Sequence, residues 1–111
     1  MSFGNYFNKD ISKVIFSSSL RILSFGREFN QDISEVVWPK ELTSLEFGAM
    51  FDKKITNLSQ NILYLTLDCD YKYYDEIDKT YIYRIYKHDV GTGKLDIIYQ
   101  KTTGTLTKRA Y

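Results

Sequence analysis

The sequence predicts a mostly β protein, built as a short solenoid of about three coils of 20–22 residues with a β-hairpin cap at its C-terminal end. Three observations predict this fold. An apolar phrase recurs at residues 1–11, 23–33 and 45–55. Each copy contains Phe-Gly and, after two further residues, a second Phe. After the third copy, two runs rich in β-branched and aromatic residues flank a Val-Gly-Thr-Gly turn, which is typical of a hairpin.

The repeated phrase reads L-x-x-L-x-F-G-x-x-F-N-x-x-I, with spacings of 22, 22 and 20 residues along its first column, Met1, Leu23, Leu45 and Leu65. The L-x-x-L-x-F part is similar to the short strand of a leucine-rich repeat. Because side chains alternate along a strand, the first and second columns enter the core while the residues between them face outward. Aromatic residues fill two of the inner columns: Phe3, Phe25 and Phe47, and Phe7, Phe29 and Phe51.

Glycine and a small polar residue recur directly after each predicted strand. The glycines are Gly4, Gly26 and Gly48, and the polar residues are Asn8, Asn30 and Asp52. A glycine at this point indicates a bend that needs either a positive φ or a close approach to the neighbouring coil. The Asn and Asp side chains are expected to form a buried ladder that bonds the backbone groups of the turns.

The C-terminal third departs from the repeat. Leu65-Thr66-Leu67 begins a fourth unit, but Asp68 replaces the glycine and no Phe-Asn follows, so we expect the coils to end there. Residues 68–78 carry five acids against one lysine and are interpreted as an acidic loop. Strands over 81–89 and 94–101 are expected to pack on the last coil and cover its open end. The predicted division is therefore a repeat solenoid over 1–67, a loop with a hairpin cap over 68–101, and a flexible tail over 102–111.

These motifs resemble the FNIP repeat family, a leucine-rich-like repeat of 22 residues found in social amoebae and in giant DNA viruses of amoebae. The matching stretches are FGNYFNKDI, LSFGREFNQDI, WPKELTSLEFG and FDKKI. Family members are often paired with an F-box, so the resemblance implies the substrate-recognition part of a ubiquitin-ligase adaptor. Because the chain starts inside a unit with no F-box before it, we expect a truncated member of a larger array.

Composition and motifs exclude several classes of function. A formal net charge of +1 argues against a dedicated nucleic-acid binder. The single cysteine, Cys69, and the single histidine, His88, lie on different predicted elements, so we expect neither a nucleophile–base pair nor a zinc site. Lys72, Tyr73 and Lys79 disqualify residues 68–79 as a calcium loop. We therefore predict that the protein is not an enzyme and that it holds no metal or cofactor.

Location follows from what the sequence lacks. No stretch approaches the ~20 apolar residues of a membrane span, and the N-terminus has no signal-peptide pattern. A single cysteine permits no intrachain disulfide. We expect no membrane contact and an intracellular, cytoplasmic location, which would be the host cytoplasm for a viral protein.

The function that the pattern favours is a protein–protein interaction module, because solenoids keep their core residues fixed and vary the outward ones. The candidate partner-binding residues lie on the outward strand positions and the adjoining turns: Ile22, Ser24, Arg27, Glu28, Ser44, Glu46, Met50, Tyr64 and Thr66. Two alternatives stay open. The first coil could self-associate through Met1, Phe3 and Phe7 as a structural element, or the chain could be a repeat fragment with no independent activity. Nucleic-acid binding through the hairpin is disfavoured.

Overall fold

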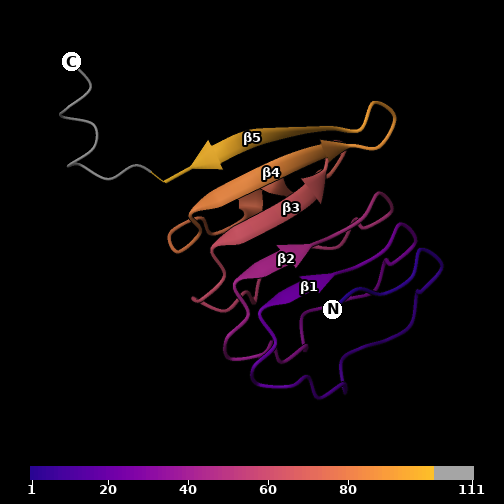
Figure 1. The fold of residues 1–111 in the computed structure, drawn as a ribbon, viewed down its shortest axis with the longest axis vertical. Helices are drawn as coiled ribbons and strands as arrows, with labels where there is room; N and C mark the ends of the chain where they lie inside the picture. Colours follow the sequence, from indigo (N-terminus) through magenta and orange to yellow (C-terminus); the bar gives the residue numbers. More distant parts are fainter. Residues whose placement is uncertain (102–111) are drawn as a thin grey trace.

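The computed structural model describes residues 1–101, and the predicted tail at 102–111 lies outside that range. The described part is mostly β, as predicted, and contains a single five-stranded sheet in the order β1-β2-β3-β4-β5 with no α-helix (Figure 1). Its elements are β1 (Ile22–Ser24), β2 (Ser44–Glu46), β3 (Tyr64–Asp68), the 3-10 helix η1 (Tyr74–Glu76), β4 (Arg84–Asp89) and β5 (Lys94–Gln100). None of the helical turns in this part has the length and apolar character of a membrane crossing.

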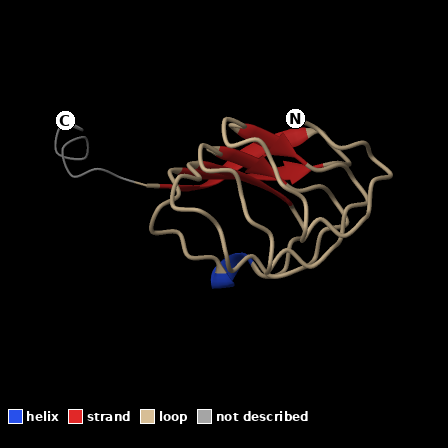
Figure 2. Cartoon of the chain, turned by 90° about the horizontal axis from the view of Figure 1, so that it is seen from below, coloured by secondary structure: helices blue, strands red, loops and turns tan. Residues whose placement is uncertain are grey.

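The first four strands are parallel and the last is antiparallel. Leu23 pairs with Leu45, Leu45 with Leu65, and Leu65 with Ile85, so successive units are offset by 22, 20 and 20 residues. An isolated bridge between Ser2 and Ser24 adds the N-terminal segment beside β1. In Figure 2 the strands gather on one side of the molecule, and the connecting loops with η1 lie on the other. One sheet therefore receives one short strand from each repeat.

The hairpin over β4 and β5 forms as an antiparallel pair, and β4 pairs in parallel with β3. Sequence analysis expected its first strand to begin at residue 81, but β4 begins at Arg84. The difference arises because the chain turns before it, where the Ile82 amide donates to the Lys79 carbonyl at 3.2 Å and the Tyr83 amide to the Leu63 carbonyl at 2.8 Å. The hairpin consequently extends the sheet of the repeats.

A fourth unit continues beyond Leu67, where sequence analysis expected the repeats to end. The Tyr71 ring stacks on Phe51 with a centroid distance of 6.0 Å, and its hydroxyl donates to the Lys53 carbonyl at 2.7 Å. Ile77 and Ile82 are buried in the same core. Tyrosine thus replaces the expected phenylalanine, because a hydrogen bond satisfies its hydroxyl while the ring fills the aromatic column.

The core consists of the columns that the repeat predicts. The leucines and isoleucine of the first column in β1 to β4 are fully buried. Phe25 stacks on Phe47 at 5.5 Å between units, and on Phe29 at 4.2 Å within its own unit. Phe29 in turn stacks on Phe51 at 6.1 Å. Because each ring touches rings of its own and the adjacent units, no unit can bury its apolar face alone.

The repeated glycines are required by close approach rather than by a positive φ. A Cβ at Gly26 would lie 2.3 Å from the Gly4 carbonyl oxygen, and one at Gly48 would lie 2.4 Å from that of Gly26. Among residues 1–101 the positive φ belongs to Gly93, in the hairpin turn, at 74°. Of the two reasons that sequence analysis allowed for these glycines, the contact between units is the one that applies.

The Asn ladder forms in the predicted order but not in the core. The Asn30 amide donates to Asn8 Oδ1 at 2.9 Å, and the Asp52 amide donates to Asn30 Oδ1 at 3.0 Å. Asn8 and Asp52 are exposed and Asn30 is half-buried, so the expectation of a buried ladder is wrong. The side chains of Asn8 and Asn30 nevertheless have the expected role, since each supplies an acceptor to the backbone of the next unit.

Candidate interaction surface

The outward side chains of the parallel strands form two rows across one face of the sheet. The strand register places Ile22, Ser44, Tyr64 and Arg84 in the first row, and Ser24, Glu46, Thr66 and Tyr86 in the second. We call these eight residues the sheet face. They alternate with the fully buried residues of the first column, so their side chains point away from the core. All six strand residues predicted as partner-binding thus lie side by side.

The three predicted residues on turns lie just beyond the strands. Arg27 and Glu28 follow β1, and Met50 follows β2. The Met50 amide donates to the Arg27 carbonyl at 3.0 Å, and the Glu28 amide donates to the Asn5 carbonyl at 2.9 Å. These bonds stack the turns of successive units, so the variable turn residues also follow one another along the repeat.

Sequence analysis missed the part of the sheet face that lies on β4, directly after the fourth unit. The Tyr83 ring meets Tyr64 edge-on at 6.1 Å, and the Arg84 guanidinium lies 5.1 Å from the centroid of the Tyr83 ring. Tyr86 lies two residues along the same strand. A signal for this unit was present in the sequence, because Ile62 and Leu65 recur at the same spacing as Ile82 and Ile85.

Arg84 is half-buried on the sheet face and lies against tyrosine side chains. Its Nε is covered and has no hydrogen-bond acceptor within residues 1–101. The nearby Tyr86 hydroxyl, which favours the charged form, raises the pKa of Arg84 above its ordinary value. Tyrosine and arginine are the residue types that contribute most to protein–protein interfaces, so this corner is the strongest candidate anchor on the sheet face.

The charges of the sheet face are not neutralised within it. Ion pairs in the described part of the chain join Arg21 with Glu41, Lys53 with Asp52, Lys54 with Glu76, and Lys94 with Asp96. Neither Glu46 nor Arg84 takes part in any of these pairs. In the part of the chain that the structure describes, this acid and this base therefore have no ion-pair partner.

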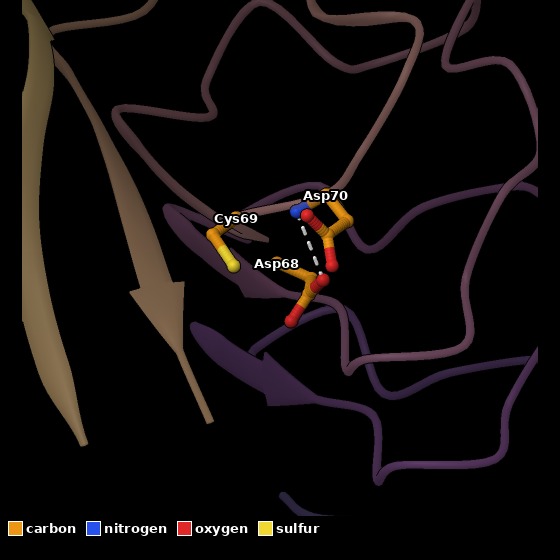
Figure 3. A group of neighbouring side chains, drawn as sticks. All are labelled: Asp68, Cys69 and Asp70. Atoms are coloured by element: carbon orange, nitrogen blue, oxygen red, sulfur yellow. Dashed lines mark hydrogen bonds between the residues drawn. The ribbon is translucent and has the colours of Figure 1, made fainter. Parts of the chain in front are cut away.

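One group of potential metal ligands occurs in the described residues. The ligand atoms of Asp68, Cys69 and Asp70 lie within 4.8 Å of one another (Figure 3). The Asp70 amide donates to Asp68 Oδ2 at 3.0 Å, which explains the approach of these two residues as a local turn. Burial, followed by the charge of Asp68, raises the pKa of the Cys69 thiol. The local turn thus accounts for the approach of the two carboxylates, and we assign no ion to this group.

Cys69 and His88 are closer together than sequence analysis expected. Asp68 and His88 are paired in β3 and β4, and the Cys69 amide donates to the His88 carbonyl at 3.0 Å. This contact involves only the backbone. Within residues 1–101 no hydrogen bond joins the thiol to the imidazole, as nucleophilic catalysis by such a pair would require.

Two hollows lie away from the sheet face. A cavity of about 370 Å³ opens where the third unit is two residues shorter, between Ile55 and Leu58 on one side and Glu76 and Tyr81 on the other. An apolar hollow of about 420 Å³ lies on the connecting loops, where Ile15 and Val37 are largely exposed. The first is lined by polar side chains, among them Gln60, Glu76 and Asp78, as well as by apolar ones.

Comparison with known proteins identifies part of the chain. Residues 7–50 match the FNIP Repeat family model. The match lies within residues 1–67, over which the resemblance was drawn from the sequence, and it confirms that resemblance. No curated protein matches the chain.

Proposed function

We propose that the protein is a protein–protein interaction module, from the premise that residues 7–50 match the FNIP Repeat family model. In this proposal the four stacked units form a short solenoid, the β4–β5 hairpin closes its C-terminal end, and the sheet face binds the partner. The pairing of such repeats with an F-box in other family members supports a finer proposal, that the partner is a substrate of a ubiquitin ligase.

The observation that carries the proposal is the contrast between fixed and varied positions. Leu23, Leu45 and Leu65 repeat one apolar type in the core. The outward residues beside them change in every unit between apolar, hydroxyl, acidic, aromatic and basic types. Burial explains the constant column, and the ordered row of different side chains beside it is the kind of extended surface that stacked repeats use for binding.

The proposal assigns no catalytic step, metal or cofactor to this protein, since recognition alone accounts for the surface. It also places the protein in the cytoplasm, because a chain with one cysteine has no intrachain disulfide that the reducing conditions there could break. Nucleic acid is not the proposed partner, because the sheet face carries one acid and one base instead of a basic excess.

The test compares how two double variants of the protein capture partners. The double variant Glu46→Ala, Tyr64→Ala alters the sheet face, and the control Ile15→Ala, Val37→Ala alters the connecting loops. We expect both to stay folded, with a loss of about 1 kcal/mol or less. Only the first should lose the partners that the immobilised protein captures from host lysate. Recovery of the same proteins with the sheet-face variant would show that the surface is assigned wrongly.

Self-association as a structural element is the second candidate. Within the described residues, the Phe3 ring stacks on Phe25 at 5.1 Å and the Phe7 ring on Phe29 at 6.0 Å, and both Phe3 and Phe7 are only partly buried. Light scattering over a hundredfold range of concentration separates the two candidates. A constant monomer mass favours the interaction module, and a mass that grows with concentration favours self-association.

A further inference from the structure

Within the described residues 1–101, the sheet face holds two charges that have no ion-pair partner, and their relative position is fixed. In the strand register Glu46 on β2 lies opposite Thr66 on β3, which lies opposite Tyr86 on β4. Arg84 lies two residues before Tyr86 on the same strand. The acid and the base are therefore separated by two strand spacings across the sheet and by two residues along it.

This offset corresponds to a distance that a peptide can match. Strands lie about 4.8 Å apart and rise about 3.3 Å per residue, so the Cα atoms of Glu46 and Arg84 are about 12 Å apart. In an extended peptide, side chains at positions i, i+2 and i+4 point to the same side. Positions i and i+4 are about 13 Å apart, so charges at those two positions reach both residues at once.

Arg84 is suited to hold a carboxylate in place. The Tyr83 ring lies 5.1 Å from its guanidinium, and Tyr83 is itself held edge-on by Tyr64. A side chain already restrained in this way loses little entropy on binding. The planar guanidinium also bonds a carboxylate through two parallel N–H groups, which fixes the orientation of the acidic residue.

We propose that the sheet face binds an extended segment of a partner protein that carries an acidic residue on Arg84 and, four residues away, a basic residue on Glu46. This inference rests on the proposed function, since it names the chemistry of the partner for the same surface. Charge complementarity selects this occupant: a purely acidic segment would meet Glu46, and a purely basic one would meet Arg84. Tyr64 and Thr66, which lie between the two charges, would contact the intervening side chains.

The probe is the heptapeptide Thr-Glu-Thr-Val-Thr-Lys-Thr, whose β-branched residues favour the extended form. Binding is measured from amide chemical shifts of the ¹⁵N-labelled protein during titration. We expect shifts at the sheet face, and binding about tenfold weaker when Gln replaces the peptide's Glu. Arg84→Glu and the milder Arg84→Gln should weaken binding by a similar factor. The peptide with Lys in place of Glu should restore binding to Arg84→Glu.

Lys87→Glu is the matched control, because it makes the same charge change on β4. Lys87 pairs with Leu67 of the core column, so it lies on the opposite side of the sheet from Arg84. Equal weakening by Lys87→Glu, equal affinity for the Gln peptide, or no binding of the Glu peptide to the folded protein would overturn the inference. If the Gln peptide binds the sheet face equally well, the proposed pairing of an acidic residue with Arg84 is wrong, but the sheet face remains the binding surface. Failure of the surface itself is seen independently, in the capture experiment with Glu46 and Tyr64 replaced.

Discussion

Replacing Gly26 with alanine should separate contact between units from backbone flexibility as the reason for the repeated glycine. The new Cβ would lie 2.3 Å from the Gly4 carbonyl oxygen and 2.7 Å from the Asn5 Cα. Ordinary contacts begin near 3.4 Å, so the first two units must separate locally by about 1 Å. That backbone is held by other bonds, including the Phe7 amide to the Gly4 carbonyl at 3.1 Å. Overpacking of this kind costs about 1–3 kcal/mol.

Gly4→Ala is the matched control, because its Cβ would meet nothing within 4 Å and its φ is not positive. Alanine there restricts the unfolded chain and should stabilise the protein by about 0.4–1 kcal/mol. Urea unfolding followed by the fluorescence of Trp38 gives both values. The total free energy of unfolding is about 5–15 kcal/mol, so a loss in one variant and a gain in the other are both large enough to measure. Equal shifts of the unfolding midpoint in the two variants would refute the explanation by contact between units.

Two further predictions concern the core and the turns. Phe29→Ala removes a fully buried ring and should cost about 3–5 kcal/mol in urea unfolding. Tyr6→Ala, at an 85% exposed site, should cost less than about 0.5 kcal/mol, and a similar loss in both would contradict the stacked core. The Ser34 amide and hydroxyl lower the pKa of Asp32 below its ordinary value of 3.8. The Asp32 carboxylate therefore stabilises the folded protein above pH 3.8, and this contribution is lost as the pH falls through the lowered pKa. Asp32→Asn should consequently make the free energy of unfolding less sensitive to acid. An unchanged dependence of the unfolding free energy on pH would contradict this.

The repeat alone was enough to predict the columns of the core. A buried strand position must be apolar in every unit, so the regular spacing of Leu23, Leu45 and Leu65 predicts that they are buried. The fourth unit was harder to recognise because Tyr71 replaces phenylalanine and Asp68 replaces glycine. Its apolar positions were nevertheless spaced as before, and it was the missing glycine and the missing Phe-Asn pair that indicated an end to the repeats.

The strand part of the candidate surface was predictable because alternation fixes which residues face outward. What the sequence could not give was the arrangement around Arg84. The edge-on contact of Tyr83 with Tyr64 depends on side-chain rotamers and on the exact register of β3 and β4. The Asn ladder shows the same limit: its bonds follow from the repeat, but the exposure of Asn8 depends on how tightly the turns are covered.

Equivalent aromatic residues from successive units stack on one another, and the same stacking aligns the rows of the sheet face. NOESY spectra with ring-labelled phenylalanine and tyrosine test it directly. We expect cross-peaks between Phe25 and Phe47, between Phe29 and Phe51, and between Phe51 and Tyr71, whose centroids are 5.5, 6.1 and 6.0 Å apart. A folded protein that lacks these cross-peaks would contradict both the fold and the surface derived from it.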